Sequence, residues 1–424
     1  MIRTFRLTML ASVLATIAVP APAATVVMDM DTVRHRMTPV VNKAKQKVPA
    51  GTVELTDGKF GKACRFEFIE GARSGFAAGV IRGDTSAWDK AAGLRFWVKG
   101  DGSASWGGLE LIDGKNYSLR YGVCFPIDST EWTQVTVPWC DVIPELAGPL
   151  VDPNGGYAPS QFRNLWFGKW HYWREYPAHS YAIDQIELLP EADVVVDKPQ
   201  PVGEGTSRVR AKLEAKKPIT IVTMGDSLSD KRHWANRKQL WSEMAVAKLR
   251  EQYGSDVKLV NPAIGGTTLS QNLVLMPRWL RDTPRPDLVV VCFGYNDWDS
   301  GVRGERFQQY LAMGVDRIRR MTGGGADILL MTTCPAFGRW NTMAEMCRAV
   351  YAVAREKKTG FADIATAFHG AGSPETALKQ TYWAWDKTHL GPKGHEAVCD
   401  VVLKAIQSGG AADLEPAAKA LWQK

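Results

Sequence analysis

The stretch Ile219 to Asp230, ITIVTMGDSLSD, decides how the second half of this chain folds. Its first six residues are apolar or β-branched and run directly into a Gly-Asp-Ser turn at residues 225–227. A short, continuous run of this kind is typical of a strand buried on both faces of a parallel sheet. We therefore predict a buried strand with Ser227 at its carboxyl end, where parallel α/β sheets bind their ligands.

Strand and helix patterns alternate from residue 218 to the C-terminus. Strand-like runs cover residues 219–224, 257–260, 287–293, 327–332 and 360–363, and helical patterns cover residues 235–252, 305–321, 342–357 and 392–407. This alternation predicts a three-layer α/β domain in which helices cover both faces of a parallel sheet. Polar residues that follow different strands should then meet at one edge of the sheet.

The polar residues at that edge are the types that acyl transfer requires. Ester cleavage by a serine needs a base, a group that orients the base, and donors for the oxyanion. We predict Ser227 as the nucleophile, His389 as the base, and Asp386 as the carboxylate that holds the imidazole. The predicted oxyanion donors are the backbone N–H groups of Ser227 and Gly266 and the side-chain amide of Asn296. A glycine suits this role because its backbone can approach a substrate closely.

Four sequence blocks resemble those of the SGNH (GDSL) hydrolases and occur in the same order. They are GDSL at 225–228, NPAIGG at 261–266, GYND at 294–297 and DKTHL at 386–390. A lone GDSL is a weak signal because Gly-Asp-Ser also forms ordinary turns, so the ordered set carries the resemblance. It covers residues 219–407 and implies a flavodoxin-like sheet without a metal or cofactor. It also places Ser227, Gly266, Asn296 and His389 at the family's four named positions, with Asp386 completing the triad.

Residues beside these blocks are candidates for substrate binding. Trp298, Trp383 and Trp385 flank catalytic blocks, where a ring could form a platform for a sugar or an acyl group. Packing in the core is the equal alternative for each ring. Arg232 lies in the loop at residues 230–234, directly after the nucleophile block. This loop either lines the substrate pocket or forms a solvated surface.

Residues 24–189 have a different pattern of short strand-length runs separated by Gly, Asp, Asn and Pro, which predicts a β-sandwich. The runs at 93–100, 132–139 and 181–186 resemble the galactose-binding-like jelly rolls of carbohydrate-binding modules. Such domains often hold a structural calcium ion, for which Asp184 is a candidate ligand. This half is rich in tryptophan, and we expect most of the rings in the core. Exposed rings would bind sugars or contact the second domain.

Residues 1–23 have the pattern of a cleaved secretory signal peptide. Arg3 and Arg6 precede an apolar stretch at residues 7–19, and Ala-Pro-Ala follows at 21–23. We therefore expect a periplasmic or secreted protein with no integral membrane segment after cleavage. A Pro- and Gly-rich linker at 190–217 should separate the jelly-roll-like domain (24–189) from the catalytic domain (218–424). Residues 208–217 of this linker are expected to form a final strand or a solvated tether.

The charge and the cysteines exclude other classes of protein. The formal net charge of +7 is a mild excess without basic blocks, so nucleic-acid binding is not expected. No Cys or His cluster has the spacing of a zinc site. The sequence contains seven cysteines. Disulfides between Cys124 and Cys140 and between Cys334 and Cys347 remain open, because sequence does not determine pairing.

The sequence thus predicts a secreted serine esterase of the acetylesterase type. We expect a carbohydrate esterase that removes acetyl groups from an O-acetylated polysaccharide or oligosaccharide. The alternative within enzymes is a lipase or thioesterase that acts on longer acyl esters. The alternative outside enzymes is a carbohydrate-binding protein whose hydrolase domain is inactive.

Overall fold

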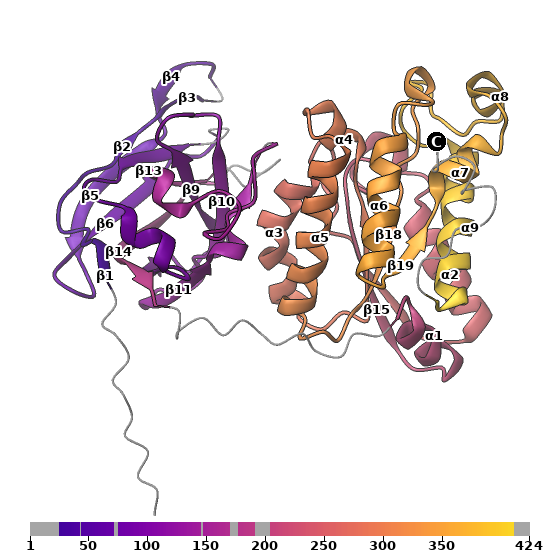
Figure 1. Cartoon of the computed structure of the whole chain (residues 1–424), viewed down its shortest axis with the longest axis horizontal. Helices are drawn as coiled ribbons and strands as arrows, with labels where there is room; N and C mark the ends of the chain where they lie inside the picture. Colours follow the sequence, from indigo (N-terminus) through magenta and orange to yellow (C-terminus); the bar gives the residue numbers. More distant parts are fainter. Residues whose placement is uncertain are drawn as a thin grey trace, which may run out of the picture.

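A computed structural model describes residues 25–42, 44–71, 75–145, 147–169, 177–190 and 204–410. Figure 1 shows a β-rich half in indigo to magenta beside a layered α/β half in red to yellow. The predicted signal peptide and residues 191–203 of the predicted linker lie outside the described residues. None of the helices in the described part of the chain combines the length and hydrophobicity needed to cross a membrane.

The first half is a β-sandwich of two six-stranded antiparallel sheets, which confirms the predicted fold. One sheet has the order β11 (Thr133–Pro138), β8 (Gly93–Gly100), β14 (His179–Leu189), β6 (Lys62–Phe68) and β5 (Gly51–Asp57), with β1 (Thr25–Met28) paired to β14. The other has the order β12 (Ile143–Pro144), β10 (Arg120–Pro126), β9 (Trp106–Asp113), β13 (Phe162–Gly168), β7 (Phe76–Val80) and β2 (Arg36–Met37). A separate hairpin joins β3 (Pro39–Val41) and β4 (Lys47–Pro49).

Aromatic rings from both sheets fill the space between them. Phe66 of β6 stacks on Phe167 of β13 at a centroid distance of 5.2 Å, and Phe96 of β8 meets Phe125 of β10 edge to face. All four rings are buried. Such ring pairs join the two sheets because each buries a large apolar area in a specific geometry.

The second half is the predicted three-layer α/β domain. Its five strands are parallel and follow the order β16 (Val257–Val260), β15 (Ile219–Gly225), β17 (Leu288–Cys292), β18 (Asp327–Met331) and β19 (Gly360–Ala362). In chain order this is 2-1-3-4-5, the flavodoxin-like arrangement. The strands are nearly continuous apolar runs because both faces of the sheet are covered.

Helices cover both faces of this sheet. One face packs against α3 (Leu269–Asp282), α5 (Gly304–Met321) and α6 (Ala344–Glu356). The other packs against α1 (Ser207–Glu214), α2 (Trp241–Tyr253), α7 (Ile364–His369), α8 (Pro374–Lys379) and α9 (Pro392–Ser408). The short helix α4 (Tyr295–Asp299) follows β17 at the carboxyl edge of the sheet.

Both expectations for residues 208–217, a strand or a solvated tether, are wrong. The chain forms α1 there, and Val209 and Leu213 are buried on one face of this helix. Arg208 Nε donates to Asp327 Oδ1 at 2.8 Å, and the backbone N–H of Val209 donates to Asp327 Oδ2 at 2.9 Å. The i, i+4 spacing of the two apolar residues favours a helix. This spacing is hard to recognise in the sequence because most residues around the two are charged.

Helix α3, which the sequence analysis did not predict, lies between the sheet and the sandwich (Figure 1). It begins with a capping box in which Thr268 and Gln271 each bond the other's backbone. On the sandwich side, Cys124 Sγ lies 2.8 Å from the carbonyl oxygen of Val274. Trp106 and Ile143 of the sandwich belong to the same hydrophobic cluster as α3 and α5. The two halves therefore share a packed interface.

The structure also shows the surroundings of the cysteines and of Asp184. All seven cysteines are free thiols in the structure, so neither open disulfide is formed. Asp184 Oδ2 accepts hydrogen bonds from the backbone N–H groups of Lys59 at 2.7 Å and Phe60 at 2.8 Å. Among the described residues, no three His, Cys, Asp or Glu side chains are grouped so that they could hold a metal ion.

Asp141 should be the most important charged residue of the interface. It accepts from both Arg317 and Arg320, and the Arg317 side chain is only 5% exposed. Asp141→Asn should therefore lower the free energy of unfolding by about 3 kcal/mol, because a nearly buried guanidinium loses its counter-charge. The matched control Asp128→Asn removes the partner of Arg281 in an exposed pair and should cost less than about 1 kcal/mol. Urea unfolding of both variants measures the difference, and equal losses would contradict this assignment.

Candidate active site

Ser227, His389 and Asp386 lie in one hydrogen-bonded line. Ser227 is in the turn after β15, and its Oγ lies 2.9 Å from His389 Nε2. On the other side of the imidazole, His389 Nδ1 lies 2.5 Å from Asp386 Oδ2. With the Nδ1 proton donated to the carboxylate, Nε2 is left to accept the serine proton. This is the geometry that a serine nucleophile needs for acyl transfer.

The short loop that carries Asp386 and His389 holds the two side chains together. Asp386 Oδ1 accepts the backbone N–H groups of His389 at 3.1 Å and Thr388 at 3.2 Å. Lys387 between them has a φ of 61°, a left-handed conformation that is costly for a residue with a side chain. Partial burial opposes ionisation, but the hydrogen bonds from His389 and Thr388 hold the pKa of Asp386 below its ordinary value. The carboxylate therefore stays charged beside the imidazole.

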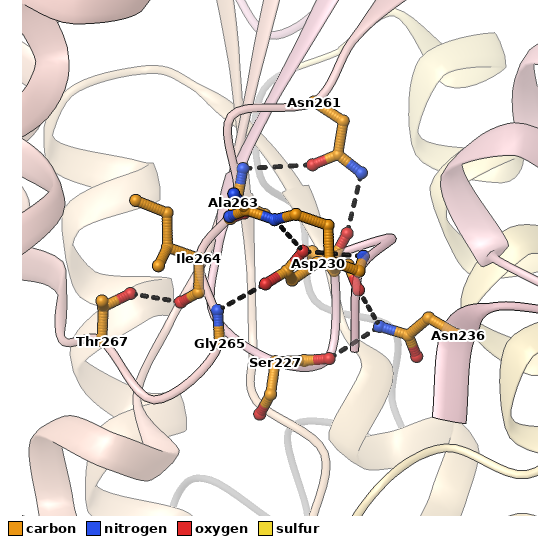
Figure 2. Close-up of polar contacts among 10 residues, drawn as sticks. Ser227, Asp230, Asn236, Asn261, Ala263, Ile264, Gly265 and Thr267 are labelled. Carbon is orange, nitrogen blue, oxygen red and sulfur yellow. Dashed lines mark hydrogen bonds and ion pairs between the residues drawn. The ribbon is translucent and has the colours of Figure 1, made fainter. Parts of the chain in front are cut away.

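Hydrogen bonds to Asp226 and Asn236 hold the turn that presents Ser227. Asp226 is buried, and its Oδ1 accepts the backbone N–H of Leu228 at 2.9 Å, as expected for a residue that braces the turn. Asn236 Nδ2 donates to the carbonyl oxygen of Ser227 at 2.7 Å (Figure 2). A Cβ on Gly225 would lie 2.7 Å from Ser229 Oγ, so glycine is required for the tight turn. These contacts fix the backbone of the turn, so that the Ser227 hydroxyl points to His389.

The predicted oxyanion donors come from two loops and from the short helix α4. Gly266 has a φ of 80°, a left-handed conformation that glycine adopts without strain. Asn296, in α4, donates through Nδ2 to the carbonyl oxygen of Thr267 at 3.0 Å, so its amide lies beside the glycine loop. Ser227 and Asn296 line one cavity of about 70 Å³, together with Asp226, Leu228, Tyr295, Cys334, Thr388 and His389.

A buried carboxylate that the sequence analysis did not single out joins the serine loop to the glycine loop. Asp230 is 1% exposed, and its Oδ2 accepts the backbone N–H of Gly265 at 2.9 Å. Its Oδ1 accepts from Arg232 Nε at 3.0 Å, and Arg232 Nη2 donates to the carbonyl oxygen of Ala263 at 3.1 Å. Figure 2 shows these contacts around Asp230. Burial opposes ionisation, but Arg232 and the Gly265 N–H hold the pKa of Asp230 below its ordinary value.

The four candidate substrate-binding residues have different positions. Trp385 is 80% exposed, and its ring stacks on Trp234 at a centroid distance of 5.1 Å. Trp298 is partly buried, with the Arg303 and Arg339 guanidinium groups within 5 Å of its ring centroid.

The expectation for Trp383 is wrong. Its side chain is only 3% exposed, and its Nε1 donates to the carbonyl oxygen of Pro335. The ring packs against Phe368 and Trp340 in the core. The core packing that was the equal alternative therefore holds for this tryptophan. Arg232, the fourth candidate, has a half-exposed side chain that pairs with Asp230.

Two aromatic residues beside His389 were not named individually from the sequence. His233 stacks on His389 with ring centroids 4.1 Å apart, and Trp234 meets His389 edge to face at 5.9 Å. Both belong to the loop at 230–234, for which pocket wall and solvated surface were equal alternatives. The sequence feature that could have identified them is their position, six and seven residues after Ser227. The structure places this part of the loop against the catalytic imidazole.

Comparison with known proteins agrees with this geometry. Residues 223–397 match the model of the GDSL-like lipase/acylhydrolase family. The matched segment is therefore similar to the GDSL-like lipases and acylhydrolases. It begins within β15 and ends within α9, so it contains Ser227, Gly266, Asn296, Asp386 and His389. This match and the geometry of the site indicate a serine hydrolase of ester bonds in the C-terminal half of the chain.

Solved structures that resemble parts of the chain include two esterases and a carbohydrate-binding module. A variant of the acetyl xylan esterase Axe2 from Geobacillus stearothermophilus is 21% identical, with 51% of this chain and 100% of that chain covered and a TM-score of 0.36. A two-domain esterase active on acetylated mannans is 17% identical, with coverages of 50% and 57% and a TM-score of 0.39. A family 11 carbohydrate-binding module from Clostridium thermocellum is 15% identical, with coverages of 39% and 95% and a TM-score of 0.31. Comparison with curated proteins gave no significant match.

The buried Asp226 should make stability depend on pH. Burial raises the pKa of Asp226 to about 7, and the Leu228 N–H only partly offsets this effect. The protonated carboxyl therefore contributes stability that is complete below about pH 4 and is lost as the pH rises through 7. Buried His35, His179 and His395, whose pKa values burial lowers to about 4, act in the opposite direction, so the effect is measured as a difference between two proteins. Between pH 4 and 8 in urea unfolding, the wild type should lose roughly 2–4 kcal/mol relative to Asp226→Asn, and parallel curves for the two proteins would contradict this origin.

Asp230→Asn should impair catalysis more than binding. Without the full charge, the carboxamide binds Arg232 and the Gly265 N–H less firmly, so the glycine loop shifts relative to Ser227. A displacement on the order of 1 Å can cost about 100-fold in rate, so we expect a 10- to 100-fold lower kcat with KM nearly unchanged. The control Asp400→Asn removes an exposed carboxylate that pairs with Lys248 and should leave both constants unchanged. A variant with normal kcat and raised KM would assign Asp230 to substrate binding instead.

Proposed function

We propose that this protein is an exported carbohydrate esterase that removes acetyl groups from an O-acetylated polysaccharide. The observation that carries this proposal is the size of the cavity at Ser227, about 70 Å³. Ordinary small-molecule pockets measure roughly 300–1,000 Å³, so this cavity is small by comparison. An acetyl group fits this space, whereas a long acyl chain needs a deep apolar pocket.

The proposed mechanism assigns a residue to each step of the reaction. Ser227 Oγ attacks the acetyl carbonyl carbon while His389 Nε2 takes the hydroxyl proton, and Asp386 stabilises the resulting imidazolium. The backbone N–H groups of Ser227 and Gly266 and the amide of Asn296 stabilise the negative oxygen of the tetrahedral intermediate. His389 then gives the proton to the leaving sugar oxygen. In the second half, a water molecule attacks the acetyl-enzyme, acetate leaves, and the Ser227 hydroxyl is restored.

The aromatic rim of the site supports a sugar as the alcohol part of the ester. Trp385 and Trp234 form an exposed stacked pair, and Trp234 also contacts the ring of His389. Exposed indole rings of this kind can pack against the apolar face of a sugar ring. The leaving group is released at His389, so a sugar held on this pair would lie where the proton is delivered.

The assignment of an exported protein rests on the N-terminal pattern. Arg3, Arg6, the apolar stretch at 7–19 and Ala-Pro-Ala at 21–23 form a Sec-type signal, and the resulting location is the periplasm or the medium. Polysaccharides are accessible substrates in either location. The β-sandwich half, with the strand pattern of carbohydrate-binding modules, supports a polymeric partner in place of a small ester.

The alternatives predict different structures. A lipase or thioesterase would need apolar depth at Ser227, and the cavity that the described residues form there is small. An inactive binding domain would lack part of the catalytic set, whereas here His389 lies within hydrogen-bond distance of both Ser227 and Asp386.

Acetate release tests the proposal directly. The wild-type protein should release acetate from at least one of acetylated xylan, mannan, xyloglucan and pectin, and should cleave p-nitrophenyl acetate faster than the butyrate or octanoate. Ser227→Ala should lower both activities by at least about 10³-fold, because the nucleophile is removed while the fold is kept. Faster turnover of octanoate than of acetate would overturn the assignment, as would undiminished acetate release by Ser227→Ala.

A further inference from the structure

The ring of His233 lies against one face of the imidazole of His389. The two ring centroids are 4.1 Å apart and the ring planes are inclined by 29°, so the rings are stacked. An imidazole donates and accepts hydrogen bonds in the plane of its ring. The bonds of His389 to Ser227 and Asp386 therefore restrain the ring within that plane. The stack with His233 is a contact on the face, and it restrains the ring against tilting out of the plane.

The loop that carries His233 is fixed to the turn that carries the nucleophile. Asn236 is fully buried, and its Nδ2 donates to the carbonyl oxygens of Ser227 at 2.7 Å and of Asp230 at 2.8 Å (Figure 2). The backbone N–H of His233 donates to the carbonyl oxygen of Asp230 at 3.0 Å. The carbonyl oxygen of His233 accepts from the backbone N–H of Asn236 at 3.1 Å. These bonds set the position of His233 relative to Ser227.

The next residue, Trp234, joins the same loop to the loop at residues 386–389. Its ring meets His389 edge to face at a centroid distance of 5.9 Å and stacks on Trp385 at 5.1 Å. Trp385 directly precedes Asp386 in the sequence. Ring contacts therefore connect the two loops that carry the nucleophile and the base, and His389 takes part in these contacts.

His233 is neutral in this arrangement. Its Nδ1 accepts a hydrogen bond from the backbone N–H of Ala235 at 3.4 Å, and a protonated imidazole has no acceptor nitrogen. His389 becomes positively charged when it takes the proton of Ser227. A neutral ring on its face does not oppose this charge, whereas a second positive charge at the same separation would repel it. His233 is only partly buried, so its ring is not part of the hydrophobic core.

We propose that His233 is a positioning residue, which holds the imidazole of His389 in line with Ser227 and Asp386 through the stack of the two rings. The inference rests on the proposed function in one respect, that His389 serves as the base of ester cleavage. His233 itself contacts neither the ester nor the transferred proton. Its effect should therefore appear in the rate of the chemical step and not in substrate affinity.

Removing and restoring the ring tests this role, with p-nitrophenyl acetate as the substrate. His233→Ala should lower kcat roughly 10- to 100-fold and leave KM nearly unchanged, because a displacement of the base by on the order of 1 Å can cost about 100-fold in rate. His233→Phe keeps a neutral ring on His389, so it should restore kcat to within about threefold of the wild type. The matched control His369→Ala removes a partly buried histidine that packs on Trp340, and neither of these residues lines the cavity at Ser227. It should leave both constants unchanged.

The proton between His389 Nδ1 and Asp386 gives a second measurement, which does not require turnover. A proton in such a short hydrogen bond resonates at low field in the NMR spectrum, and it is observed only while the ring is held in place. The wild type and His233→Phe should show this resonance, and His233→Ala should lose it through exchange with water.

Two results would overturn the positioning role. One is a normal kcat together with a retained low-field resonance in His233→Ala, and the other is an equal loss of kcat in His233→Ala and His233→Phe. If the wild type cleaves no ester, the proposed function fails. The NMR comparison of the same three proteins then still decides whether His233 holds the imidazole.

Discussion

The hydrogen bond between His389 and Ser227 joins residues 162 positions apart, and the rest of the structure is arranged around it. The nucleophile follows the second strand of the sheet in spatial order, and the histidine lies in the loop before the last helix. Only a sheet whose strands all point the same way brings those two loops to one edge. Because the bond is 2.9 Å long, the β15 turn and the loop at 386–389 must be held firmly. The buried Asp226, Asp230 and Asn236 hold the first, and Asp386 holds the second.

The interface between the halves has a second consequence for the site. Helix α3 begins next to the glycine loop and ends at the sandwich, so one element touches both the predicted oxyanion donors and the N-terminal half. Packing at the sandwich end restrains the helix whose first turn adjoins Asn296 and Thr267. The sandwich therefore contributes to the position of the site.

Much of the fold was predictable because its patterns are local. The buried strands of the α/β half are uninterrupted apolar runs, and the sandwich strands are short and separated by turn residues, so both fold classes could be predicted. Helix α3 was not predicted, although its capping box is visible in the sequence, because apolar residues occupy most of its faces. Helix α1 was predicted as part of a linker because it has too few apolar residues, and only Val209 and Leu213 lie on its buried face.

The sequence by itself determined the chemistry at the sheet edge, since Ser, Gly, Asn and Asp-x-x-His in that order specify the groups for acyl transfer. It also determined the alternation that makes the sheet parallel. Tertiary structure alone decided which aromatic residues face the site, because exposure depends on neighbours distant in the chain. Trp383 and Trp385 are two residues apart, yet one is packed against Phe368 and the other is open to solvent beside Trp234. Tertiary structure also determined the shape of the small cavity, because it is lined by residues that are far apart in the chain.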